Sequence, residues 1–190
     1  MNKIFCIGSN KTGTTTLTKI LENLGLRVCP EYIMFSFGSK YFEEQKNGRY
    51  ENLFKLVERY DAFEDRPWNH ADFYQQLDKK FTDSKFILTI RDENNWIESY
   101  RRFNQKIKLN KQWFYPIVSE ICYNNQDFLQ DEKNMIKHYK KRNEEIIEYF
   151  KNTDKLLILD FEKNKEYKPI CEFLGKEIVL SEIPHLNRTK

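Results

Sequence analysis

The segment KIFCIGSNKTGTTTL, residues 3–17, constrains the fold of this chain more than any other part of the sequence. It begins with a short apolar run that ends at Gly8, as buried parallel strands do. The loop after this run contains Gly13, and apolar residues at helical spacing follow until Gly25 ends the pattern. A second, weaker strand is expected over residues 26–29. This order of strand, glycine loop, helix and strand predicts a doubly wound α/β domain.

The rest of the chain continues the alternation of strands and helices. Residues 84–92 and 155–161 have clear strand patterns, and residues 61–68 begin as a short strand that Pro67 ends. Apolar spacing predicts helices over these ranges: 50–60, 70–81, 96–107, about 111–122, about 126–151 and 167–175. Residues 31–45 are aromatic and favour no element. The chain of 190 residues has no repeat or linker, so one domain, residues 1–190, is expected.

The composition narrows the classes of protein to consider. The 32 basic and 29 acidic residues give a net charge of +3, which argues against a nucleic-acid-binding protein and suits a small anionic ligand. The densest basic run, residues 137–142, is interpreted as the solvated face of a helix. The four cysteines lie far apart in no metal-ligand spacing. Neither a signal peptide nor a membrane span is indicated, so a soluble, cytoplasmic protein is expected.

The loop between residues 8 and 14 has the composition of an anion-binding site. The first N–H groups of a helix and its dipole attract an anion, and Gly13 lets the backbone wrap closely around a phosphate. Lys11 supplies a positive charge from within the loop. Four hydroxyl donors accompany it: Thr12, Thr14, Thr15 and Thr16. The alternative is an ordinary helix start, where Gly13 makes a turn and a threonine caps the helix.

The position of Lys11 indicates which anion is handled. Nucleoside triphosphatases place a lysine directly after the second glycine of such a loop and bind magnesium through a distant aspartate. Here the lysine lies two residues before Gly13, and Asp160 is the one acidic strand end available, without a companion. A transferred group with less charge than phosphoryl would not need the metal. The loop therefore favours sulfuryl transfer without a metal ion over phosphoryl transfer.

Two motifs resemble those of the P-loop sulfotransferases, which use 3′-phosphoadenosine 5′-phosphosulfate (PAPS). NKTGTTTL, residues 10–17, is similar to their 5′-phosphosulfate loop. RDENNWIES, residues 91–99, is similar to their 3′-phosphate motif, an arginine that ends a strand and a serine eight residues later. Shorter stretches extend the resemblance over nearly the whole chain: DAFEDRPW, KFILTIRD, LLILDF, CEFLGKEI and PHLN. The chain departs from the family's pattern at Glu93, where proline is common, and at Ile183, where phenylalanine is usual.

The resemblance implies a P-loop-type three-layer α/β fold and in-line, metal-independent sulfuryl transfer that releases adenosine 3′,5′-bisphosphate (PAP). Lys11 would act on the leaving phosphate oxygen, and Arg91 and Ser99 would hold the 3′-phosphate. Arg188 would close over the nucleotide. The alternative for Arg91 is an ion pair with a neighbouring carboxylate, and Glu93 would weaken phosphate binding unless it faces solvent. The acceptor would be a hydroxyl or amine of a small molecule, glycan or peptide.

The acceptor also needs a general base. Asp65 is the first candidate, because it lies in a loop directly after a short predicted strand and the resembling proteins keep an acidic residue there. Glu64 is its neighbour, and His70 and His185 are weaker candidates. A structural role for Asp65, as a helix cap or in an ion pair with Arg66, is an alternative interpretation.

Two other functions are compatible with the sequence. The first is a P-loop kinase or hydrolase, which magnesium dependence would identify. The second is a nucleotide-binding protein that keeps the loop but has no turnover. The sequence indicates neither the acceptor nor the oligomeric state.

Overall fold

The protein is represented by a computed structural model that describes residues 2–108 and 131–177. The helix expected near residues 111–122 lies outside the described residues. So do the C-terminal candidates His185 and Arg188.

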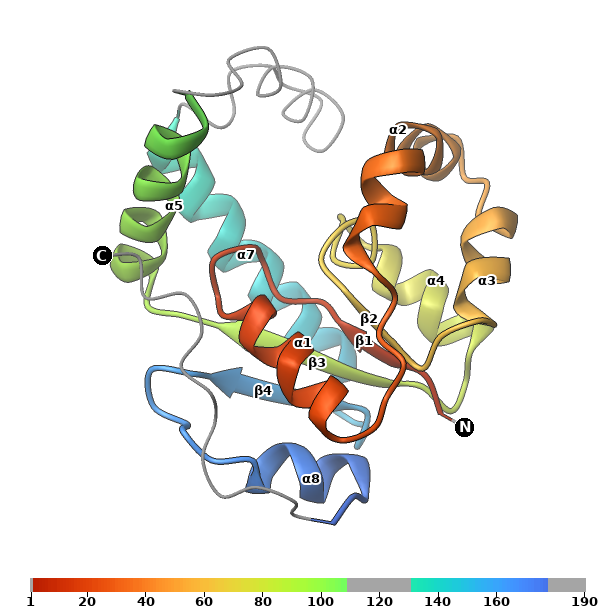
Figure 1. Cartoon of the computed structure of the whole chain (residues 1–190). Helices are drawn as coiled ribbons and strands as arrows, with labels where there is room; N and C mark the ends of the chain where they lie inside the picture. Colours follow the sequence, from red (N-terminus) through yellow and green to blue (C-terminus); the bar gives the residue numbers. More distant parts are fainter. Residues whose placement is uncertain (1, 109–130, 178–190) are drawn as a thin grey trace.

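A four-stranded parallel sheet forms the centre of the fold (Figure 1). Its strand order is β2-β1-β3-β4. The strands are β1 (Ile4–Cys6), β2 (Ala62–Glu64), β3 (Lys85–Ile90) and β4 (Leu156–Asp160). These match four of the predicted strands. The fifth, over residues 26–29, is wrong: the segment contributes an isolated bridge between Val28 and Ala62, because Pro30 follows and the chain turns into a helix.

Helices cover both faces of the sheet (Figure 1). Those in the described residues are α1 (Thr14–Asn23), α2 (Glu31–Lys46), α3 (Glu51–Val57), α4 (Phe73–Lys80), α5 (Glu93–Lys108), α7 (Glu132–Phe150) and α8 (Lys168–Leu174). Helix α2 occupies the aromatic segment for which the sequence favoured no element. It begins directly after Pro30, whose fixed backbone suits the start of a helix.

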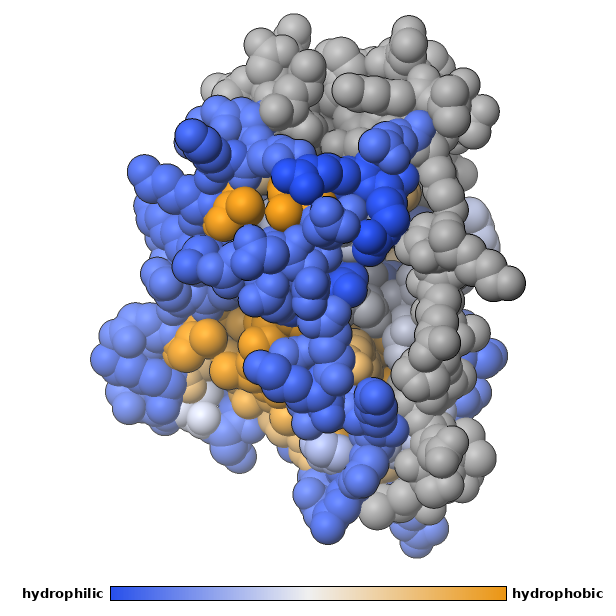
Figure 2. Space-filling model, turned by 90° about the vertical axis from the view of Figure 1, so that its left-hand side faces the viewer, coloured by the Kyte–Doolittle hydropathy of each residue, from blue (hydrophilic) through white to orange (hydrophobic). Residues whose placement is uncertain are grey.

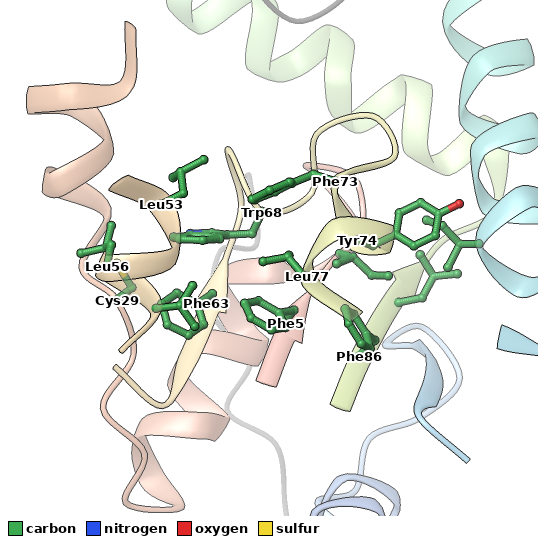
Figure 3. Packing of buried hydrophobic residues seen from close by; sticks show 14 of the residues in the cluster. Phe5, Cys29, Leu53, Leu56, Phe63, Trp68, Phe73, Tyr74, Leu77 and Phe86 are labelled. Carbon is green, nitrogen blue, oxygen red and sulfur yellow. The ribbon is translucent and has the colours of Figure 1, made fainter. Parts of the chain in front are cut away.

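The alternation of side chains along β1 produces the three layers. Ile4 and Cys6 point to one face, where they pack with α1 and α8. Phe5 and Ile7 point to the other face, where they pack with α3, α4 and α7. The second core is aromatic, as the composition suggested (Figure 3): the Phe5 ring centroid lies 5.1 Å from that of Phe63 and 5.5 Å from that of Phe86. The predicted three-layer α/β fold is confirmed.

Helix α7 corrects one interpretation of the sequence. The basic run at residues 137–142 was expected to be solvated, but Tyr139 is 4% and Arg142 is 7% exposed. Both belong to a buried stripe at helical spacing with Met135, Ile146 and Phe150. The other four residues of the run, three lysines and His138, are exposed. On the face of the molecule that Figure 2 shows, hydrophilic residues surround smaller hydrophobic areas. One arginine of this basic run, Arg142, is therefore buried against the rest of the protein.

The strand order fixes where a ligand can bind. Strand β1 pairs with β2 on one side and with β3 on the other. The connection from β1 to β2 therefore runs to one side of β1, and the connection from β2 to β3 crosses back to its other side. In parallel sheets, ligands bind at such a switch point, beyond the carboxyl ends of the strands. The loop at residues 8–13 leaves β1 there, and Arg91 follows β3 at the same edge. The topology thus brings the two sequence motifs together.

Candidate active site

The loop between β1 and α1 presents an uncapped helix start. Gly13 is the N-cap residue, with a left-handed φ of 101°, and no side chain caps the helix. The first helical hydrogen bond runs from the Leu17 N–H to the Gly13 carbonyl. The preceding N–H groups of the first turn therefore have no acceptor within the helix. The alternative of a threonine cap is not realised, and the arrangement is that of an anion-binding helix N-terminus.

Two glycines make this loop possible. A Cβ on Gly8 would lie 1.9 Å from the Thr89 Oγ1 and 2.6 Å from the Thr89 carbonyl oxygen. A Cβ on Gly13 would lie 2.5 Å from the Phe161 Cδ2, and the φ of Gly13 is one that other residues rarely adopt. The loop therefore packs directly on β3 and on the segment after β4, without room for a side chain at either glycine.

Thr12 points into the protein rather than toward a ligand. It is 3% exposed, and its hydroxyl donates to the Ser9 carbonyl at 2.5 Å. The Thr89 hydroxyl oxygen lies 2.6 Å from the Thr12 hydroxyl oxygen. Because the Thr12 proton is already donated to Ser9, Thr89 must be the donor of this second hydrogen bond. Thr12 fixes the loop to β3, and its side chain is not available to an anion.

The other three threonines lie at the start of α1. Thr14 is 7% exposed, and its hydroxyl acts on the carboxylate of Glu64, where it lowers the pKa against the effect of burial. Thr15 is exposed and Thr16 is half-buried. Of the four hydroxyl donors that the sequence suggested, Thr15 and Thr16 are the ones that a ligand can reach.

Lys11 and Arg91 meet at the switch point. The Arg91 Nη1 lies 3.5 Å from the Lys11 carbonyl oxygen, across 80 residues of sequence. The Lys11 Nζ lies 4.3 Å from the centre of the Phe103 ring on α5. Ser99, on the same helix, is 7% exposed. Tyr139 fixes the backbone of Arg91, because its hydroxyl accepts from the Arg91 N–H at 2.8 Å and donates to the Arg91 carbonyl at 2.9 Å.

A carboxylate already holds the guanidinium of Arg91. Its Nε and Nη2 lie 2.9 and 2.7 Å from the Glu162 Oε1. Asn95 donates to the other oxygen of Glu162 at 3.0 Å. The sequence suggested a neighbour of Arg91 as partner, but Asp92 instead accepts the N–H groups at the start of α5. Glu162 therefore binds the donors that an anionic ligand would need.

Glu93, the departure from the family's pattern, does not face Arg91 in an ion pair. Its carboxylate lies 3.0 Å from the Nζ of Lys140 on α7. The hydrogen bond and charge of Lys140 lower the pKa of Glu93. The charge of this residue is thus offset locally, at an exposed position.

The two candidate carboxylates after β2 differ in their surroundings. Burial raises the pKa of Glu64 to about 7, and the charge of Asp65 adds to the shift. Asp65 has a left-handed φ of 60°, and its Oδ1 accepts from the Arg66 N–H at 2.8 Å. Asp65 therefore shapes the turn, whereas Glu64 projects toward the first residue of α1, Thr14.

Asn69 is a residue that sequence reasoning missed. Its Nδ2 lies 3.0 Å from the Gly8 carbonyl oxygen and 3.1 Å from the Asn10 Oδ1. It ties the turn after β2 to the anion loop. The weaker base candidate His70 follows it and lines a cavity beside the loop. No motif marks Asn69 in the sequence, since only the tertiary contact gives it a role.

The fold is thus that of an α/β protein whose glycine loop places an uncapped helix start beside an arginine at the switch point of a parallel sheet. The family model described as Sulfotransferase domain matches residues 3–190. The chain therefore belongs to the sulfotransferase family, and its activity in general terms is sulfuryl transfer. A search of curated proteins finds no match.

Two further observations concern the part of the chain that the structure describes. Within residues 2–108 and 131–177, no helix is both long and apolar enough to cross a membrane. The same residues contain no group of three or more histidine, cysteine or acidic side chains placed to hold a metal ion.

Proposed function

We propose that this sulfotransferase uses PAPS as its donor and transfers the sulfuryl group in line to an acceptor without a metal ion. The contact between Arg91 and the Lys11 carbonyl carries the proposal. It places a bidentate anion binder beside a helix N-terminus, so a nucleotide with phosphates at both its 3′ and 5′ positions can reach both. Asp160 is the acidic strand end that the sequence offered for a magnesium ion. Its carboxylate accepts the Glu162 N–H and pairs with Lys163 at 3.3 Å, so it is engaged by protein groups.

The loop fits the 5′ end of the donor. The N–H groups of Thr14, Thr15 and Thr16 start α1 without helical acceptors, and a phosphosulfate carries oxygens to accept them. Arg91 and Ser99 fit the 3′-phosphate, for which a planar guanidinium supplies two parallel donors. We propose that Arg188, which lies outside the described residues, closes over the nucleotide.

Lys11 and Glu64 are the proposed catalytic residues. When the donor binds, it supplies the sulfuryl group, whose bond to the phosphate oxygen breaks as a bond to the acceptor oxygen or nitrogen forms. Lys11 stabilises the charge that develops on the departing oxygen. Glu64 takes the acceptor's proton, because a pKa of about 7 suits a base near neutral pH. Asp65, our first candidate from the sequence, would hold the turn that positions Glu64.

The free thiols indicate that the protein resides in a reducing compartment. The described cysteines Cys6, Cys29 and Cys171 are all buried and free of disulfides. Burial raises the pKa of Cys29 to about 12, so this thiol is unreactive at neutral pH. We therefore propose a cytoplasmic location. We also propose that residues 1–190 form a single domain, as the sequence indicates.

Calorimetric titration tests the donor assignment. PAP should bind more tightly than ADP or ATP, equally well with and without magnesium, and Arg91→Ala should weaken PAP by about 10- to 100-fold through loss of a bidentate charged contact. Arg101→Ala is the matched control, because Arg101 forms an ion pair with Glu132 on the protein surface. Tighter binding of ATP with magnesium would replace the proposal with a kinase or hydrolase.

Removal of the carboxylate that holds Arg91 should tighten nucleotide binding. Glu162→Gln leaves the guanidinium free to bind the 3′-phosphate, and we expect PAP to bind about 2- to 5-fold more tightly, the range of a partly exposed ion pair. The same titration measures this, with Glu132→Gln as the control carboxylate. Weaker binding in Glu162→Gln would mean that Glu162 positions Arg91 instead of competing with the ligand.

A further inference from the structure

A small cavity lies beside the anion loop, on the side of the turn after β2. Its volume is about 80 Å³, and residues of the loop, the turn, α5 and α7 line it. Polar groups on its wall include Asn10, Arg66, His70, His138 and Arg142. The lining residues include no aspartate or glutamate. The wall is therefore rich in hydrogen-bond donors, and it carries two arginines, of which Arg66 pairs with Asp65 at 4.0 Å.

Arg142 supplies the fixed charge of this wall. It projects inward from α7, is 7% exposed, and its Nη2 donates to the Asn69 carbonyl at 2.6 Å. The amide of Asn69 in turn binds the Gly8 carbonyl and Asn10. The guanidinium is thus tied to the anion loop through one residue. In a poorly hydrated site, a guanidinium attracts an anion more strongly than it does at the surface.

Aromatic side chains form another part of the wall. Trp96 stacks on Tyr139, with ring centroids 4.4 Å apart and an interplanar angle of 11°. The Trp96 Nε1 donates to the Asn10 carbonyl at 2.9 Å, so this wall is also fixed to the loop. Tyr100 extends it, with its ring centroid 5.6 Å from that of Trp96. An occupant therefore meets both aromatic surface and cationic donors.

The size and place of the cavity limit its occupant. A water molecule takes about 30 Å³ in the liquid, so the cavity has room for a group such as a carboxylate, and the remainder of a ligand must lie outside it. Ser9 and Asn10 line the cavity and directly precede Lys11. The cavity therefore adjoins the reacting end of the proposed donor site.

We propose that this cavity binds an anionic group of the acceptor, so that the enzyme sulfates hydroxyl compounds that carry a carboxylate or a similar anion beside an aromatic or apolar body. The proposal rests on the proposed function, since it requires the donor in the adjoining loop. It selects among the acceptors that the sequence left open, because a cationic amine would meet Arg142 and Arg66. Like charges repel in a poorly hydrated site, which sets the direction of selectivity.

Three phenols of similar size test the proposal: 4-hydroxyphenylacetate, 2-(4-hydroxyphenyl)ethanol and tyramine, which carry an anionic, a neutral and a cationic group. Each is titrated by calorimetry into the enzyme saturated with PAP. We expect the anion to bind at least about 10-fold more tightly than the neutral compound, as one charge-assisted hydrogen bond allows, and tyramine to bind most weakly. Arg142→Gln should remove the preference, and Arg142→Lys should restore part of it.

Lys141→Gln is the matched control, because it removes one positive charge from the neighbouring, exposed position of α7. Arg66→Gln repeats the test at a partly exposed side chain, if Arg142→Gln lowers the melting temperature too far for titration. Equal binding of the three phenols, including no binding of any, would overturn the proposal. So would a loss of PAP affinity in Arg142→Gln, because the cavity would then serve the donor. Failure of the wild type to bind PAP would overturn the proposed function itself.

Discussion

Glu64→Gln should lower kcat by about 10²- to 10⁴-fold, the usual contribution of a positioned general base. Glutamine keeps the size of the side chain and can still accept hydrogen bonds, but it cannot take a proton. Wild-type kcat/KM should rise with pH through an apparent pKa near 7, the value to which burial raises the carboxyl of Glu64. The rate of PAP release from PAPS, with the best phenol of the panel as acceptor, measures both effects.

Stability provides the control for this variant. The pKa of Glu64 is raised in the folded state, so the folded protein binds more protons than the unfolded chain between about pH 4.5 and pH 7. Stability is therefore lost as the pH rises through this window, and Glu64→Gln should be more stable than the wild type at pH 8 by up to about 3 kcal/mol. A variant that is inactive yet more stable has lost a catalytic group.

Asp65→Asn distinguishes the two carboxylates. Asparagine also tolerates the left-handed φ of this position and can accept from the Arg66 N–H, so we expect a loss of less than about 10-fold in kcat. A larger loss in Asp65→Asn than in Glu64→Gln would return the role of base to Asp65. The role of base would also return to Asp65 if kcat/KM of Glu64→Gln still rose with pH through the same apparent pKa as in the wild type.

Lys11→Met should lower kcat by about 10²- to 10³-fold, because one preorganised charge on the departing oxygen stabilises the transition state by about 3–4 kcal/mol. Methionine keeps an unbranched apolar side chain but lacks the terminal ammonium, which lies over the Phe103 ring. The charge matters most in the transition state, so the affinity for PAP should fall by a smaller factor than kcat does. Single-turnover release of PAP from PAPS and calorimetric titration of PAP give the two quantities.

Lys19→Met is the control for this experiment. Lys19 lies on α1 at an exposed position, where it pairs with Glu22 at 3.2 Å. Its removal changes the net charge equally and should leave kcat within about 2-fold of the wild type. If Lys11→Met lost PAP affinity in full proportion to kcat, the lysine would bind the ground state and the transition state equally, contrary to the proposed role.

Local sequence was sufficient for most elements of the fold. The strands β1 and β3 are buried apolar runs, β4 is an apolar run that is only partly buried, and the helices α1, α5 and α8 follow apolar spacing. Each pattern therefore reports the environment of its own segment. The segment of α2 was not predicted, because its aromatic residues follow no clear helical spacing. The strand expected at residues 26–29 forms only an isolated bridge, because Pro30 follows it and the chain turns into α2.

The partners of the site residues, in contrast, could not be predicted from local sequence. Arg91 was identified from its motif, yet its carboxylate partner, Glu162, lies 71 residues away. Asn69 and Arg142 carry no motif, and the charge run around Arg142 even suggested exposure to solvent. Their roles depend on which helix face packs inward, and that is decided by every element in contact with α7.

The sequence by itself determined the α/β alternation, the glycine loop and the two phosphate motifs, because these depend on backbone conformation and on residues close together in the chain. Only the tertiary structure decided that Lys11 meets Arg91, that Glu162 holds the guanidinium, and that a cationic cavity adjoins the loop. These contacts arise because β1 and β3 pair at the switch point of the sheet, and such pairing joins residues whose separation in sequence leaves no local pattern.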